Sequence, residues 1–302
     1  MTPRKAAAAV ADTIDTKIHT RALLVWLTIS TWSARKYDRK ITQEVNARMN
    51  ASSDAGRYNK MLLPGDAKAY QTLITTASSV RTQHYTRTLA WSDEGYRLLP
   101  TAAYMDFNTW FREQSRIFDR ALDEFVDAYP TMRRNAASLL NGAYRDDDYP
   151  SVLDIRKRFQ LGVKFRPLPN FGDVRVELAS DQVHAIEQQI QADIEAAVST
   201  AVRDAWGRLH SVVARISERL NDPEAIFRDS LIENAQEICK TLKTLNVTQD
   251  ADLEAMRVRV AQQLTTFSPD TLRDAPRVRK SVAADADKIL DAMRAFYAPE
   301  SE

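Results

Sequence analysis

The stretch SDQVHAIEQQIQADIEAAVSTAVRDAWGRLHSVVARISERLNDP, residues 180–223, decides the fold, because its apolar residues recur at every third or fourth position. This spacing predicts one helix of about 40 residues that begins at Ser180 and ends before Pro223. At 1.5 Å per residue it spans about 60 Å, more than the width of a compact domain of this size. It must therefore project, lie along several partners or form a coiled-coil seam. The stripe comprises Val183, Ile186, Ile190, Ile194, Val198, Val202, Trp206, Leu209, Val213, Ile216 and Leu220.

Downstream of this helix the pattern remains helical. Apolar spacing predicts three further helices, near 224–245, 249–266 and 269–296, and the last has a Ser-Pro start at Ser268. Residues 180–297 are therefore expected to form an all-helical or coiled-coil domain, followed by a tail of residues 298–302.

Upstream, residues 1–21 are expected to be a loose or helical lead-in, and residues 22–179 a mixed α+β domain. In RALLVWLTISTW, residues 21–32, alternation favours a strand over about 23–30 that leads into a helix over about 32–49. The alternative is a helix that continues through the whole run, since short apolar runs fit both.

Two further segments carry β signals. LAWSDEGYRLLP, residues 89–100, reads as a hairpin around a turn that ends in glycine. LGVKFRPLPNFGDVRVEL, residues 161–178, alternates on both sides of a Pro/Asn/Gly connection. Helices are predicted around them, near 66–87, 102–128, 130–143 and 151–158. The predicted class is mainly α (α+β), with a small antiparallel sheet in the N-terminal part.

Composition sets limits on function. The chain has 302 residues, of which 44% are hydrophobic and 27% charged, with a net charge of +1. A lone cysteine, Cys239, cannot form an internal disulfide, which favours a reducing compartment. With no apolar run of about 18 residues we expect no membrane span and a cytoplasmic protein.

The sequence contains none of the common catalytic or ligand-binding motifs. It has no phosphate-binding glycine loop, no zinc-ligand spacing and no Gly-x-Ser-x-Gly elbow. We therefore expect no catalytic residue, no cofactor and no metal. An enzyme stays a third hypothesis, because catalytic groups can converge from distant positions.

STWSARKYDRKIT, residues 30–42, combines cations with aromatic residues. On a helix over 32–49 its cations would form a basic stripe, and phosphate contacts with base stacking are what single-stranded nucleic acid requires. Basic pairs and triplets near residues 133 and 156 could extend such a surface. The alternative is that Trp32 packs inward and the cations face water. The nucleic-acid candidates are Trp32, Arg35, Lys36, Tyr37, Arg39, Lys40, Arg133, Arg134, Arg156, Lys157 and Arg158.

The same region resembles the N-terminal signature of an uncharacterised family of bacteriophage and plasmid proteins. The signature is a hydrophobic run, then Ile-Ser-x-Trp, then small and basic residues, as in LTISTWSARKYDRKIT, residues 27–42. GYRLLP, residues 95–100, and DEFVDAYP, residues 123–130, are also similar, so the resemblance covers about residues 22–135. Such proteins tend to be encoded beside a MoxR-type AAA+ ATPase and a von Willebrand-like metal-adhesion protein. The resemblance implies an adaptor role, in the host cytoplasm if phage-encoded, and supplies no catalytic residues.

We therefore predict a non-enzymatic scaffold or adaptor that self-associates or docks on a protein partner such as an AAA+ ATPase. Part of the long stripe would supply the interaction face: Ile186, Ile190, Ile194, Val198, Val202, Trp206 and Leu209. The alternative is a protein that binds single-stranded DNA or RNA.

Overall fold

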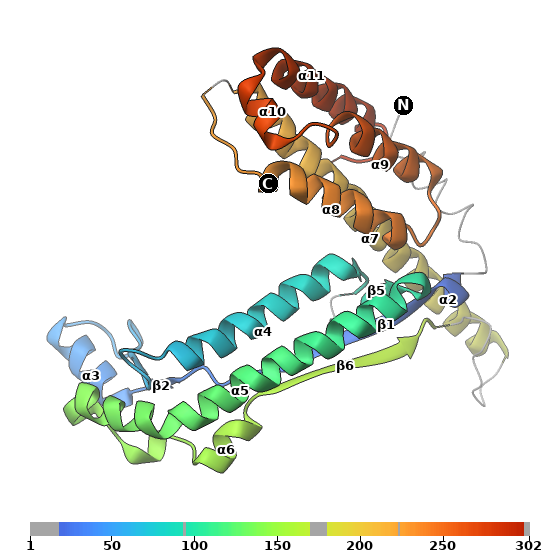
Figure 1. Ribbon diagram of the computed structural model, residues 1–302. Coiled ribbons are helices and arrows are strands. Elements are labelled where there is room, and N and C mark those ends of the chain that lie inside the picture. The colour runs from blue at the N-terminus through green and yellow to red at the C-terminus, as the bar shows by residue number, and fades with distance from the viewer. Residues whose placement is uncertain (1–17, 93–94, 170–179, 223, 299–302) are drawn as a thin grey trace. The chain divides into compact units, whose positions relative to one another are not determined.

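The computed structural model describes residues 18–92, 95–169, 180–222 and 224–298 (Figure 1). The predicted long helix is confirmed as α7, Ser180–Asn221, with 42 residues. The class is also confirmed: the chain is mainly helical, with a small antiparallel four-stranded sheet in its N-terminal part and an all-helical C-terminal region.

Within residues 224–298, which the structure describes, four helices follow α7, and two predicted boundaries were wrong. The helix expected from 224 begins only at Ser230. The helix expected over 269–296 divides at Ala275, whose ψ of 87° lies outside the helical range because the residue precedes Pro276. Ser268 caps the helix that follows it, as predicted. The four are α8 (Ser230–Leu245), α9 (Ala251–Gln263), α10 (Pro269–Asp274) and α11 (Pro276–Met293).

The main sheet has the order β4-β5-β1-β6. Its strands are β1 (Ala22–Ser30), β4 (Leu89–Ala90), β5 (Arg97–Pro100) and β6 (Gln160–Pro167). β4 and β5 pair antiparallel, which confirms the predicted hairpin, and β5 pairs with β1 in the register Leu24↔Leu98. The second strand expected near 174–178 lies outside the described residues.

The remaining helices also correct one boundary. Helices were predicted over 102–128 and 130–143, but α5 is continuous and contains Pro130. Tyr129 and Ala136, on either side of this proline, are fully buried, and their packing offsets its lost hydrogen bond. The elements are α2 (Ile18–Arg21), α3 (Arg39–Arg48), α4 (Lys68–Arg87), α5 (Tyr104–Leu140) and α6 (Val152–Lys157), with short 3-10 turns at Thr101–Ala103, Asn141–Ala143 and Asp146–Asp148.

The predicted helix over 32–49 was wrong in its first half. Residues Arg35–Tyr37 form strand β2, which pairs antiparallel with β3, Asn59–Met61. The helix there starts only at Arg39, because the Asp38 side chain caps it by accepting from the Ile41 N–H at 3.1 Å.

Contacts divide the chain into two compact units that are interleaved in sequence, whereas the predicted limits of 22–179 and 180–297 follow chain order. Unit 1 combines Met1–Trp26, His84–Asn108 and Lys164–Glu302, and unit 2 combines Leu27–Gln83 and Thr109–Val163.

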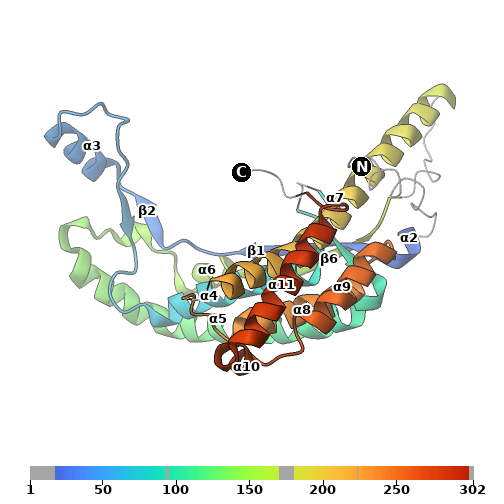
Figure 2. The ribbon, with the colours of Figure 1, turned by 90° about the horizontal axis from the view of Figure 1, so that it is seen from above.

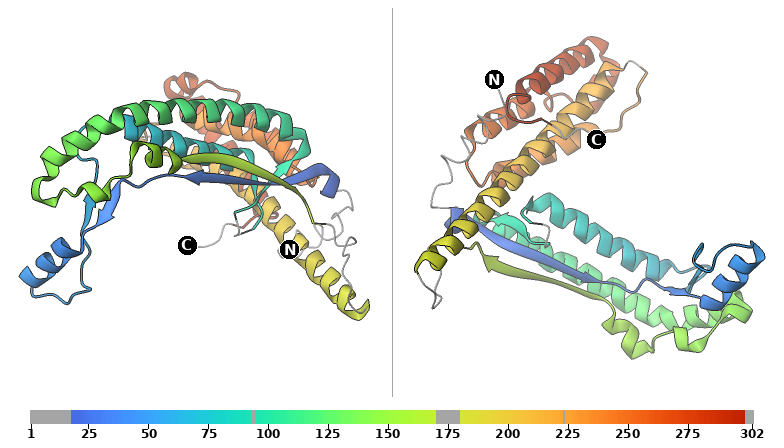
Figure 3. Two further views of the ribbon diagram at one scale, coloured as in Figure 1. Left: turned by 90° about the horizontal axis from the view of Figure 1, so that it is seen from below. Right: turned by 180° about the vertical axis from the view of Figure 1, so that it is seen from behind.

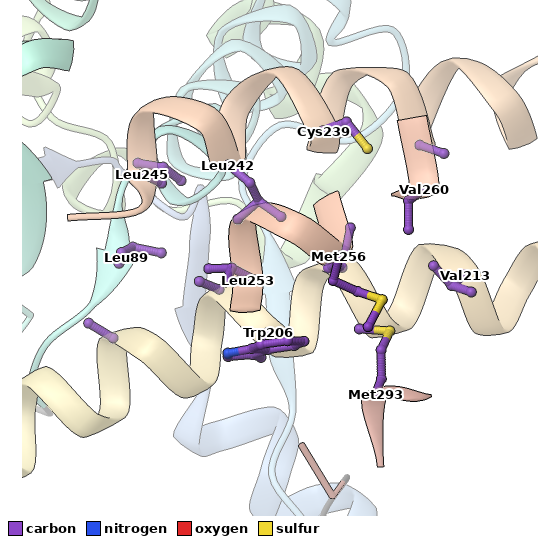
Figure 4. Close-up of a cluster of buried hydrophobic side chains, with 14 of the residues drawn as sticks. Leu89, Trp206, Val213, Cys239, Leu242, Leu245, Leu253, Met256, Val260 and Met293 are labelled. Atoms are coloured by element: carbon purple, nitrogen blue, oxygen red, sulfur yellow. The ribbon is translucent and has the colours of Figure 1, made fainter. Parts of the chain in front are cut away.

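The core of unit 1 lies where α8, α9 and α11 pack against α7. Figure 4 shows Trp206, Leu242, Met256 and Met293 converging from these helices. Cys239 belongs to this core and its burial raises the pKa of its thiol to about 11, so it packs as an apolar side chain, as its sequence context suggests.

The core of unit 2 lies between α4 and α5, which run side by side in Figures 1 and 3. It is rich in aromatic residues. Phe125 contacts Tyr129 and Phe159 with ring centroids 5.7 and 5.4 Å apart. Leu73 of α4 completes this layer.

Candidate docking site

The β2–α3–β3 segment of unit 2, residues 35–61, contains the densest group of predicted site residues and is called the basic module below. In its ladder Arg35 pairs with Met61 and Lys36 with Lys60. Neighbouring side chains on a strand point to opposite faces. Lys60 is buried, so Arg35, Tyr37 and Met61 share the other face, and all three are exposed.

Lys60 anchors the module through a buried ion network. Its Nζ lies 2.6 Å from the Asp148 carboxylate and 3.4 Å from that of Asp38, and donates to the Ala143 carbonyl at 2.8 Å. Two carboxylates and a carbonyl compensate the desolvation of the ammonium. The Ile41 N–H, followed by Lys60, holds the pKa of Asp38 below its usual value. The network therefore ties β3 to the start of α3 and to the turn after α5.

A cleft of about 320 Å³ opens beside this network. Asp38 and Asp148 exceed Lys60 by one negative charge, and the three cations Arg39, Lys40 and Arg145 exceed that in turn, so the wall is net positive. The cleft can therefore receive an anionic group such as a carboxylate. Its lining comprises Tyr37, Asp38, Arg39, Lys40, Gln43, Lys60, Arg145 and Asp148.

Helix α3 buries polar side chains. Thr42 donates to the Asp38 carbonyl at 2.7 Å and accepts from the Tyr58 N–H at 3.0 Å. Asn46 donates to the carbonyls of Ser53 and Gly56 at 3.2 and 3.4 Å. Both side chains are buried, so hydrogen bonds to the loop after α3 hold the helix in place.

The apolar residues of α3 lie outside this buried face. Ile41, Val45 and Met49 are spaced by four and share one side of the helix; they are called the α3 stripe. Val45 is 45% exposed and Met49 71%, while Ile41 is half-buried. Tyr37, Tyr58 and Met61 add exposed apolar surface within the module. Such grouping on a small module is typical of an interaction surface.

The module also carries unpaired positive charge. Residues 35–61 hold seven Lys/Arg against three Asp/Glu. In the described parts of the chain, no carboxylate lies within 4.0 Å of the Arg35, Lys36, Arg39 or Arg48 side chains, and Lys40 lies 3.9 Å from Glu44. The charge and the stripe together favour a partner that is both anionic and apolar.

Trp32, a nucleic-acid candidate, is partly buried and packs against the core of unit 2. Its ring makes edge contacts with Tyr70 and Tyr129, with centroids 6.2 and 6.0 Å apart, and its carbonyl accepts from the Tyr70 hydroxyl. The packing alternative is therefore correct for Trp32. The structure does bring together Arg35, Lys36, Tyr37, Arg39 and Lys40, on a strand and a helix start.

The other basic candidates lie on α5 and α6, and most make local contacts. Arg133 pairs with Asp146 at 2.5 Å and Arg156 with Asp123 at 2.5 Å. Lys157 pairs with Asp154, Arg134 donates to the Thr131 hydroxyl, and Arg158 is the exposed C-cap of α6.

The chain itself covers most of the α7 stripe, so only its first turns remain open as part of the predicted interaction face. Ile194, Val198, Trp206 and Leu209 are buried in the core of unit 1. Ile190 and Val202 are partly buried against the same core. Ile186 stays 36% exposed, since the covering helices do not bury the first turns of α7.

Sequence reasoning missed the anchoring role of Lys60 and the exposed pair Val45 and Met49. The four-residue spacing of Ile41, Val45 and Met49 was a visible signal for a stripe. Thr42 and Asn46 are buried instead of this stripe. Thr42 accepts from the Tyr58 N–H and Asn46 donates to the Ser53 and Gly56 carbonyls, and no local sequence pattern predicts these bonds to the following loop.

No protein-family model, curated protein or solved structure matches this chain. Among the described residues, no group of three or more His, Cys, Asp or Glu side chains is arranged to hold a metal ion. None of the helices in the described residues is long and apolar enough to span a membrane.

Proposed function

We propose that this protein is a non-enzymatic cytoplasmic scaffold or adaptor that docks on another protein through its basic module. The observation that carries the proposal is the inverted burial of α3, in which Thr42 and Asn46 are buried and Val45 and Met49 are exposed. Leaving such a stripe in water costs about 25 cal/mol per Å² of apolar surface, and a partner that covers it recovers this free energy.

A partner protein other than this chain is suggested by the resemblance to the phage and plasmid family. It points to an AAA+ ATPase, and a negatively charged, partly apolar patch on such a protein would fit the module. Self-association through the same surface is the other form of this proposal.

The test replaces Val45 with a photo-crosslinking amino acid in cells that produce the chain, and Leu153 on α6 in a matched control. Leu153 is 80% exposed and lies outside the module. We expect a discrete product from position 45, identified by mass spectrometry and lost when Met49→Asp is added. Equal products from both positions, or none from position 45, would contradict the proposal.

Nucleic-acid binding is the second candidate, favoured by Arg35 and Tyr37 on one exposed face of the β2–β3 ladder. It predicts that single-stranded DNA binds with an affinity that falls steeply between low and moderate salt. Fluorescence anisotropy of the wild type and of an Arg35→Gln/Lys36→Gln/Arg39→Gln variant distinguishes the two candidates, because loss of tight binding in the variant would favour this one.

A further inference from the structure

The N-terminal half of α7 has charge opposite to that of the basic module. Residues 181–202 contain the carboxylates Asp181, Glu187, Asp193 and Glu195 and no Lys or Arg. Asp193 accepts from Gln189 at 2.8 Å and Glu195 from Gln191 at 2.7 Å, both on α7 itself. These hydrogen bonds leave the negative charge of both carboxylates uncompensated.

The same turns carry apolar residues that the fold covers incompletely. Val183, Ile186 and Ile190 are spaced by three and four, and each is exposed or half-buried. The first buried residue of α7 is Ile194 within the part whose side chains are described. Figure 2 shows these turns extending beyond α8, α9 and α11 within unit 1.

Charges border the apolar stripe on each helix. At 100° per residue, Glu187 and Asp193 lie on the two sides of Ile186 and Ile190 on α7. Arg48 lies beside Val45 on α3 by the same geometry. Residues 181–193 span about 20 Å and α3 about 15 Å, so the two stripes are comparable in length.

We propose that the α3 stripe binds residues 181–193 of α7 from a second copy of this chain. The inference rests on the proposed docking function and names its occupant. Apolar surface supplies the affinity, and Glu187 and Asp193 facing module cations supply the orientation. Because two different surfaces meet, the contact is heterologous: a dimer leaves the α7 surface of one copy and the α3 stripe of the other free, so further copies can add.

The test uses two full-length variants, each disabling one surface. Val45→Asp/Met49→Asp disables the α3 stripe, and Ile186→Asp/Ile190→Asp disables the α7 surface. Leu153→Asp is the matched control, since Leu153 lies outside both surfaces. Circular dichroism checks that each variant is folded, and Ile186→Asp with Glu187→Arg replaces the second variant if Ile190→Asp unfolds it. Light scattering then measures mass against concentration.

We expect the mass of the wild type and of Leu153→Asp to rise with concentration, while each double variant stays monomeric. An equimolar mixture of the two variants should give a dimer and nothing larger, because only one intact pair of surfaces remains.

Assembly of the Ile186 variant alone would overturn this inference but leave module docking intact. A wild type that stays monomeric at every concentration would also overturn it, whereas a position-45 crosslink to another protein would still support the proposed function.

Discussion

Helices α3 and α7 both carry apolar side chains at every third or fourth position, yet only α7 has them covered by its own chain. From Ile194 onward, α8, α9 and α11 of unit 1 pack on the α7 stripe. On α3 the buried side is polar, and Val45 and Met49 face water. The difference teaches that spacing identifies a helix, whereas the elements that cover the stripe decide whether it is core or interaction surface.

The two stripes should differ most in how far truncation of one side chain lowers the free energy of unfolding. Leu209→Ala removes a fully buried side chain from the α7 stripe and should lower the free energy of unfolding by about 2–5 kcal/mol. Val45→Ala on the α3 stripe should change it by less than about 0.5 kcal/mol. Urea denaturation followed by circular dichroism measures both, and equal losses would contradict the contrast.

The polar anchoring of the basic module should also be visible. Lys60→Met leaves Asp38 and Asp148 buried without their ammonium partner and should cost about 3 kcal/mol. Lys36→Met, at the paired position of the ladder, removes an exposed charge and should cost little. Thermal unfolding of both variants provides the comparison. If Lys60→Met were as stable as Lys36→Met, the network would not hold the module.

As pH falls, unit 1 should lose stability at a higher pH than the basic module does. Burial, followed by the charge of Arg97, lowers the pKa of His84 from 6.5 to about 4, so the folded state holds this imidazole neutral. The stabilisation is complete above pH 6.5 and is lost as pH falls toward 4, by about 2 kcal/mol between pH 7 and pH 5. The pKa of Asp38 is lowered from 3.8, so the module network keeps its charge in this window.

The measurement is the free energy of unfolding from urea titrations at pH 7 and pH 5. In His84→Gln, which removes the titrating group, the difference between the two pH values should shrink by the same amount. An unchanged difference would show that another group produces the acid sensitivity.

The smallest effect should come from a single hydrogen-bonding side chain under α3. Thr42→Val keeps the shape of the side chain but leaves the Tyr58 N–H without its acceptor, which should cost about 1 kcal/mol. Gln43→Ala on the exposed side should be neutral. Denaturant midpoints distinguish the two, and a neutral Thr42→Val would mean that the hydrogen bond does not stabilise the module.

The sequence predicted regular elements well where one physical signal acted alone. The α7 stripe, the strand over β1, the hairpin around β5 and the helix start at Ser268 all appear in the structure. These signals are local, because each depends on residues a few positions apart.

Predictions that needed distant residues were wrong. The Trp32 region was expected to be helical, but pairing with β3 makes Arg35–Tyr37 a strand. Pro130 was expected to end a helix that buried neighbours keep intact. The basic candidates of residues 35–40 lie together because they are neighbours in the sequence, whereas the face that exposes Val45 and Met49 depends on the loop that binds Thr42 and Asn46.

The most direct test of the α3 stripe as a docking surface is thiol labelling at Met49→Cys, with Met105→Cys as control. Met49 is 71% exposed and Met105 70%, and the native Cys239 is buried with a pKa raised to about 11, so it labels slowly. We expect both introduced thiols to react equally fast in dilute protein, and only position 49 to become protected as concentration rises or a partner is added. Two results would contradict the account. Either position 49 is protected even in the most dilute protein, or it stays unprotected at every concentration and with every added partner.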